Sequence, residues 1–163
     1  MNETFVTAKA AIVAFFGAVG IFLGWRGIMA LVWVVLMLLD YITGTLAARK
    51  DGTWKSAIAR EGLWHKGGMI LVVLVAVIAD MIMAVALPHI PVLNIAWPNV
   101  LFPMVLAWYI VTELGSILEN AIKMGAKVPV WLVKLLDATL KAVDKVGESA
   151  TENLLDTSDG EDS

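Results

Sequence analysis

Three acidic residues lie inside long apolar stretches, where an ionised side chain is unfavourable. Asp40, Asp80 and Glu113 each interrupt a run of about 20 residues, the length that spans a bilayer as a helix. A carboxylate in hydrocarbon costs on the order of 3 kcal/mol or more, so it is retained where it meets water, a cation or a hydrogen-bond donor. These acids therefore predict polar contacts between packed helices or a water-filled groove.

Small and hydroxyl side chains accompany the acids at helical spacing. Gly44 and Ala48 follow Asp40 at intervals of four residues and share its stripe of a helix, and Thr43 lies near that stripe. Small residues flank Asp80 in the same way. Two interpretations stay open for both acids: a polar contact or wetted groove that serves function, and a structural acid hydrogen-bonded to a threonine or tryptophan.

Glu113, Ser116 and Asn120 form a further polar stripe, at positions i, i+3 and i+7 of one helix. Glu113 lies near the inner end of its stretch, where it could reach a lipid headgroup or a lysine. Asp40 and Asp80 are expected ~12 Å and ~20 Å from the same side, at 1.5 Å rise per residue. The sequence therefore does not predict a direct pair of these two acids.

Residue types that carry catalysis or metal binding do not converge. The chain has no cysteine and no Gly-rich phosphate loop. Its two histidines, His65 and His89, are predicted on opposite sides of the membrane, and no serine, histidine and acid form a set. We therefore expect no enzyme activity, no cofactor, no metal site and no nucleic-acid partner.

The elements that must hold the acids are apolar helices. The chain has 163 residues, of which 60% are hydrophobic, and a mean hydropathy of +0.81, whereas soluble domains are about 45–50% apolar. Four stretches are long enough to cross a bilayer: 5–23, 27–48, 67–87 and 99–118. We predict an all-α polytopic membrane protein, with about four transmembrane helices within residues 1–120.

The first stretch, 5–23, has an alternative placement. Because it contains Lys9, it could lie on the membrane without crossing it. Gly17, Gly20 and Gly24 are candidates for close helix packing, since Gly20 and Gly24 form a GxxxG pattern that lets two helix backbones approach. The pattern fits packing within one chain as well as a face between two chains.

Positive charge is concentrated in one connection and after the fourth stretch. The basic residues of the connection 49–66 are expected to contact lipid headgroups: Arg49, Lys50, Lys55, Arg60 and Lys66. The connection 88–98 has no charged residue, and five further lysines follow the last stretch. Because Lys and Arg mark the cytoplasmic side of short loops, we predict that 49–66 and both termini lie inside and 88–98 outside.

The chain changes character twice after the last stretch. Apolar residues in 121–147 follow a helical period, which predicts an amphipathic helix that lies on the inner leaflet or packs on its own bundle. All six charged residues in 148–163 are acidic, and removing them from the net charge of −3 leaves the remainder at +3. We predict that this acidic tail is disordered.

A series of short motifs resembles the bacteriophage holin family, which includes toxin-secretion holins of clostridia. In order, the motifs are Asp40-Tyr41-Ile42-Thr43-Gly44, Arg60-Glu61-Gly62, His65-Lys66-Gly67, Ala79-Asp80, the run from Glu113 to Asn120, Gly125 and Pro129. The resemblance covers roughly residues 30–136. The acidic tail departs from the basic terminus usual in the family.

The resemblance implies a small phage- or prophage-encoded protein of the bacterial inner membrane. It would form homo-oligomers and open lesions through which an endolysin or a toxin crosses. Two other functions stay compatible with the residues: a small ion or solute channel lined by Asp40 and Asp80, and a holin antagonist or structural partner without a pore of its own. Release of graded dextrans from liposomes distinguishes these three.

Overall fold

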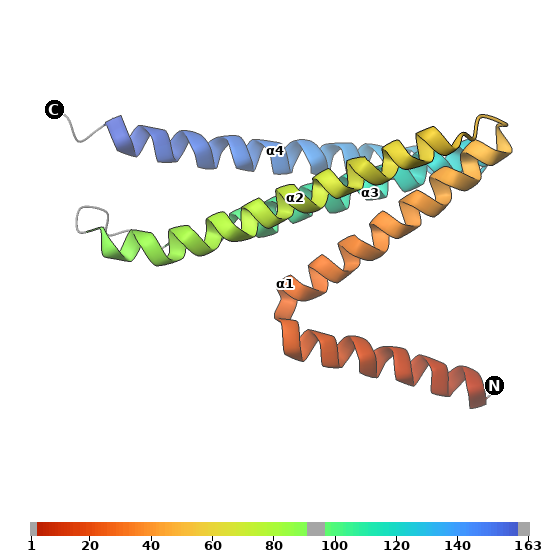
Figure 1. Cartoon of the computed structure of the whole chain (residues 1–163), viewed down its shortest axis with the longest axis horizontal. Coiled ribbons are helices and arrows are strands. Elements are labelled where there is room, and N and C mark those ends of the chain that lie inside the picture. The colour runs from red at the N-terminus through yellow and green to blue at the C-terminus, as the bar shows by residue number, and fades with distance from the viewer. Residues whose placement is uncertain (1–2, 91–96, 160–163) are drawn as a thin grey trace.

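A computed structural model describes the backbone of residues 3–90 and 97–159, and the side chains of Thr7, 24–90, 97–150 and Glu152. Four α-helices and one short 3-10 helix form this part of the chain (Figure 1): α1 (Glu3–Lys50), α2 (Ser56–Ala86), η1 (Leu87–His89), α3 (Leu101–Lys123) and α4 (Val130–Asp159). The described residues contain no strand. The prediction of an all-α fold is confirmed.

Three helical segments are long and apolar enough to cross a membrane. Within the described residues these segments are Gly24–Lys50, Ser56–His89 and Leu101–Lys123. The side chains of the first predicted span, 5–23, lie outside those residues except for Thr7, so its crossing stays a prediction. The helix α1 bends at Gly24 (Figure 1), where φ is +63° and ψ is −174°, a conformation that glycine adopts without a Cβ clash.

The predicted connection 49–66 is mostly helix. The helix α2 begins at Ser56 rather than at 67, so the turn between α1 and α2 is limited to residues 51–55. The polar residues in the first turns of α2 lower the local hydropathy but not the helix propensity, since Arg, Glu and Lys are good helix formers. Hydropathy therefore located the apolar part of α2 and missed its first three turns.

The amphipathic helix is longer than predicted and is displaced along the chain. The helix α3 continues to Lys123, and a turn at Gly125 (φ +93°) separates it from α4. Because α4 extends to Asp159, the prediction of a disordered tail from 148 is wrong as far as that residue. Alanine, leucine and glutamate in this segment favour helix. Residues 160–163 lie outside the described part.

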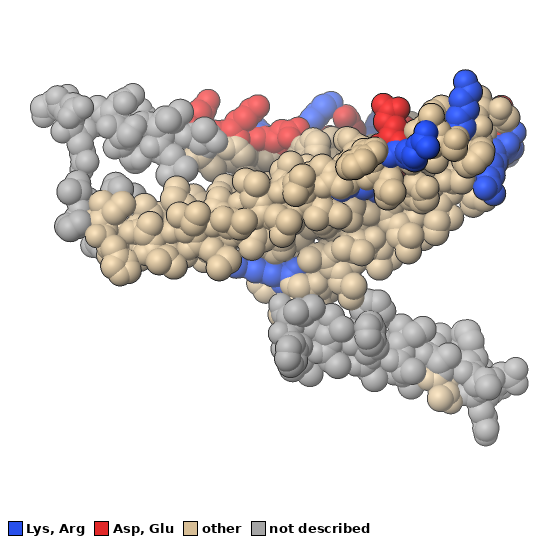
Figure 2. All heavy atoms as spheres, in the orientation of Figure 1, with Lys and Arg blue, Asp and Glu red and all other residues tan. Residues whose placement is uncertain are grey.

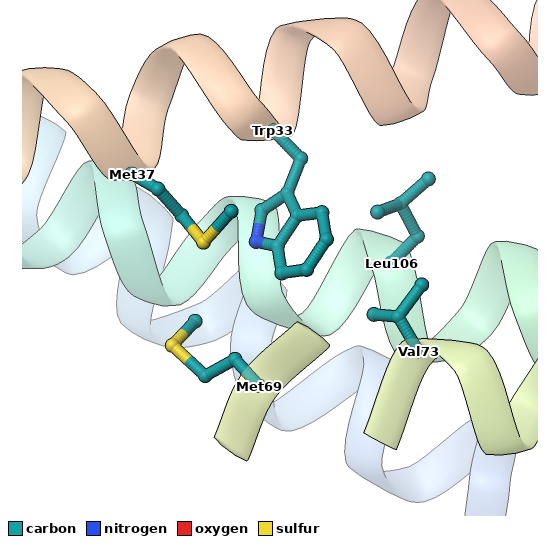
Figure 3. Packing of buried hydrophobic residues seen from close by; sticks show 5 residues of the cluster. All are labelled: Trp33, Met37, Met69, Val73 and Leu106. Atoms are coloured by element: carbon teal, nitrogen blue, oxygen red, sulfur yellow. The ribbon is translucent and has the colours of Figure 1, made fainter. Parts of the chain in front are cut away.

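The helix α3 is central, because it packs against α1, α2 and α4. Its contact with α1 and α2 is centred on a small apolar core (Figure 3), made of Trp33, Met37, Met69, Val73 and Leu106. The Trp33 ring also stacks on Tyr109 of α3, with ring centroids 5.8 Å apart. This core fixes the three candidate spans relative to one another and places their polar residues.

The outward flank of α1 and α2 is apolar over most of its length (Figure 2). Large side chains such as Leu38, Leu71 and Val75 are more than half exposed on it. Lysines and arginines gather at the end that holds the α1–α2 and α3–α4 turns, which we call the basic end. A continuous apolar flank of this kind is suited to contact with lipid.

Candidate functional site

A buried ion-pair cluster joins the three candidate spans. The Nζ atom of Lys66 on α2 lies 3.0 Å from Asp40 Oδ2 on α1, and 2.7 Å from each carboxylate oxygen of Glu113 on α3. The three side chains are 13%, 19% and 3% exposed, respectively. We call this group, together with Thr43 and Asn120, the lysine cluster.

Amide and hydroxyl groups complete the lysine cluster. Asn120 Nδ2 donates hydrogen bonds to Asp40 Oδ1 (3.0 Å) and to Thr43 Oγ1 (3.3 Å). Thr43 Oγ1 donates in turn to the backbone carbonyl of Asp40, at 3.1 Å. A Cβ atom at Gly44 would lie 3.4 Å from Asn120 Nδ2, so glycine at this position leaves room for the Asn120 amide.

The cluster lies well inside the bundle. Asp40, Lys66 and Glu113 are each ten residues from the end of their helix at the basic end, which is ~15 Å at 1.5 Å rise per residue. An ion pair at that depth holds the helices in register, because removing one partner leaves an uncompensated charge, at a cost of about 3–5 kcal/mol. The arrangement thus specifies how α1, α2 and α3 fit together.

Asp80 belongs to a separate site, at the start of α3. It is 4% exposed, and its Oδ1 accepts hydrogen bonds from Trp97 Nε1 (2.8 Å) and from the Leu101 amide (3.1 Å). Its Oδ2 accepts from the Phe102 amide, at 2.9 Å. The first amides of a helix have no partner within that helix and carry a partial positive charge. Asp80 therefore caps α3 from α2, as in the structural interpretation of this acid.

Arg26 and Asn99 are close to this cap. Arg26 Nη2 donates to the carbonyl of Asn99, at 3.2 Å, and so connects α1 to the turn that precedes α3. Asn99 adopts φ +52°, a backbone region that asparagine tolerates better than most residues. Arg26 and Asn99 line one hollow with Asp80. Asp40 and Asp80 thus have separate partners, as the difference in depth predicts.

Two residues predicted to contact headgroups also bond to groups of the bundle, Lys66 from a largely buried position and Lys50 from an exposed one. Lys66 is in the lysine cluster, and Lys50 Nζ lies 2.6 Å from the carbonyl of Met124, where it caps the end of α3. No local sequence pattern predicts these contacts, because the partners are distant in the chain. The guanidinium of Arg49 lies over the Trp54 ring, and Lys55 and Arg60 are exposed. Contact of the exposed residues Arg49, Lys50, Lys55 and Arg60 with lipid stays a prediction.

The structure places two further candidates, Ser116 and Gly24, outside the lysine cluster. Ser116 does not join Glu113 and Asn120, because it lines the groove between α3 and α4. Gly24 forms the bend of α1, and among the described residues no atom lies within 4 Å of a Cβ built there, so its part in helix packing stays a prediction. Gly17 and Gly20 lie outside the residues whose side chains are described.

The helix α4 lies alongside α3. Its half-buried residues follow one stripe, Leu132, Leu136, Leu140 and Val143, and this stripe faces α3. Near the far end of the contact, Trp108 Nε1 donates to Asp144 Oδ1, at 2.7 Å. The charged residues of α4 whose side chains the structure describes are all exposed: Lys134, Asp137, Lys141, Asp144, Lys145, Glu148 and Glu152. A set of such charges would cost on the order of 10 kcal/mol against hydrocarbon.

The family of this chain is decided by its match to known sequences. A family model for the bacteriophage holin family matches residues 17–141. The chain belongs to the bacteriophage holin family. The holin match includes the three candidate spans, the lysine cluster, the Asp80 cap and the first part of α4.

Relatives of this holin-family chain occur in several bacteria. Uncharacterized proteins of Listeria innocua and Halalkalibacterium halodurans are 30% and 32% identical over 131 and 127 residues, which are 80% and 78% of this chain and 85% and 87% of theirs. A Clostridium perfringens protein, described as an uncharacterized 14.9 kDa protein in the nagH 3′ region, is 33% identical over 63% of this chain and 70% of its own. No solved structure matches.

Proposed function

We propose that this chain is a lesion-forming holin of the bacterial inner membrane. Membership of the holin family carries the proposal, since the matched region includes all three candidate spans of the described residues. Many copies would assemble and let an endolysin or a toxin leave the cell. One bundle of these dimensions cannot enclose a protein-sized hole, so the function requires a homo-oligomer.

The distribution of polar surface supports this assembly. Each copy at the rim of a hole in a membrane needs an apolar side toward lipid and a polar side toward water. The bundle has both, because the flank of α1 and α2 is apolar and the exposed side of α4 is charged (Figure 2). The lysine cluster and the Asp80 cap hold the spans together and act as positioning groups in this proposal.

The basic end is proposed to face the cytoplasm. It holds the α1–α2 turn and the α3–α4 turn, and the basic side chains Arg49, Lys55 and Lys127 are exposed there. Retention of short basic loops on the cytoplasmic side favours this orientation. In this orientation the C-terminus lies on the cytoplasmic side of an intact membrane, because its charged side chains are costly to place in hydrocarbon.

Co-expression with an endolysin that has no secretion signal tests the proposal in cells. Expression of both proteins should release the endolysin and lyse the culture, whereas either protein alone should leave the cell wall intact. Collapse of the membrane potential without release of the endolysin would favour a small channel. Delay of lysis by a second holin, with no lesion of its own, would favour an antagonist.

A further inference from the structure

The two faces of α4 have opposite character. One face packs on α3 through apolar side chains such as Leu136 and Leu140. The other carries lysines and acids of mixed sign, among them Lys141 and Asp137, which pair at 2.7 Å with side chains 74% and 61% exposed. The exposed positions of α1 between Trp33 and Tyr41, and those of α2 between Met69 and Ala86, carry no charge. Away from the basic end, charged surface among these described residues is thus concentrated on α4.

The charged face of α4 is level with the membrane-spanning part of α3. A Cβ atom at Gly147 would lie 3.6 Å from Met104 Cε, and Met104 is three residues from the start of α3. Toward the other end, Ile122 of α3 and Val133 of α4 line the same groove. The two helices are therefore antiparallel, and residues 133–147 of α4 extend along nearly the whole candidate span.

Hydrocarbon cannot surround α4 in this position. Ionised side chains at membrane depth require water or partners of opposite charge. The pair Lys141–Asp137 neutralises two of the charges, but Lys134, Lys145 and Glu148 are also exposed on the helix. Water satisfies charges of both signs without a matching partner surface, so it is the medium that fits this face best.

We propose that α4 forms the water-facing wall of the membrane lesion. The helix α3 holds α4 in place, and the apolar flank of α1 and α2 faces lipid or neighbouring copies. The inference rests on the proposed lesion-forming function. In the open lesion, where water reaches that side of the bundle, α4 lies along α3. In an intact bilayer, α4 stays on the cytoplasmic side.

A reversible cross-link tests this position directly. The chain has no cysteine, so the double variant Met104→Cys/Gly147→Cys can be joined by a short bis-methanethiosulfonate reagent without background. The full-length protein is placed in vesicles of phosphatidylethanolamine and phosphatidylglycerol that contain labelled dextran. The pair Leu38→Cys/Gly147→Cys is the control, because α1 makes no contact with α4 in the described residues.

Single-cysteine variants report which face meets water. Lys141→Cys lies on the charged face, and Leu71→Cys lies on the apolar flank with 64% exposure. A charged, membrane-impermeant thiol reagent is added to leaking vesicles. Lys141→Cys should react at least about tenfold faster than Leu71→Cys, because thiols in hydrocarbon are not reached by a charged reagent.

The expected result is a cross-link within one chain of Met104→Cys/Gly147→Cys, dextran release unchanged by that cross-link, and fast labelling of Lys141→Cys. Failure of the pair to cross-link in leaking vesicles would overturn the inference, as would slow labelling of Lys141→Cys. Release that stops on cross-linking and returns on reduction would show that α4 must leave α3. Retention of dextran by the wild type and by the reduced variant would instead refute the proposed function, and the inference with it.

Discussion

Lys66 is the residue whose loss should most disturb the bundle. Replacement by methionine removes the ammonium that lies 3.0 Å from Asp40 and 2.7 Å from Glu113, and it keeps an unbranched side chain of similar length. Two carboxylates then stay inside the bundle with no cation between them. Breaking a buried ion pair on one side costs about 3–5 kcal/mol, which is a factor of roughly 10² to 10⁴ in the folding equilibrium.

A matched neutral variant separates loss of charge balance from loss of packing. In Asp40→Asn/Lys66→Met/Glu113→Gln, no charge is left without a partner, and Asn120 can still bond to the side chain at position 40. Replacement of a complete buried ion group by neutral residues is often close to neutral for stability. We expect the triple variant to lie within about 2 kcal/mol of wild type.

Denaturation in mild detergent, monitored by tryptophan fluorescence, gives the free energy of unfolding of the wild type, Lys66→Met and the triple variant. Lys66→Met should be the least stable, and the triple variant should recover most of the loss. A loss below about 1 kcal/mol in Lys66→Met would show that the pair contributes no more than an exposed one. A triple variant less stable than Lys66→Met would refute the reasoning from uncompensated charge.

Three other predictions concern the cap, the glycine beside Asn120 and the orientation. Asp80→Leu removes all three accepted hydrogen bonds and should lower the free energy of unfolding by about 2–4 kcal/mol. Asp80→Asn should lower it by less. Equal losses in the two variants would contradict the capping role. Gly44→Ala should change the free energy of unfolding by less than about 1 kcal/mol, since its Cβ would lie 3.4 Å from Asn120. Gly44→Leu should lower it by about 1–3 kcal/mol, because the larger side chain crowds Asn120. The same unfolding assay checks both variants, and a tolerated Gly44→Leu would mean that this contact is loose. Ser56→Cys should be protected from impermeant thiol reagents in whole cells before lysis, and early labelling from outside would reverse the proposed orientation.

The acids were identifiable from sequence, but most of their partners were not. Asp40, Asp80 and Glu113 are conspicuous because each interrupts an apolar stretch. Lys66 was assigned to lipid because it lies where the apolar part of α2 begins, and hydropathy treats that boundary as a loop. The partners of Asp80 include two backbone amides, which no side-chain pattern reveals.

The course of α4 depends on tertiary packing. Its helical period predicted an amphipathic helix with an apolar stripe, and left open whether that stripe met lipid or the bundle. The Trp108–Asp144 hydrogen bond and the fit of Gly147 beside Met104 decide for the bundle. Contacts this distant in sequence follow no local period, so the direction of α4 could not be predicted from the chain alone.

The most direct test of lesion formation is release of graded dextrans from vesicles that contain the purified chain. Ions, small dextrans and protein-sized dextrans are trapped together and measured separately as the amount of protein per vesicle rises. A lesion-forming holin should release the protein-sized dextran along with the ions, with a steep dependence on protein density that reflects assembly of many copies. Release of ions with full retention of every dextran, at all protein densities, would contradict the proposed function.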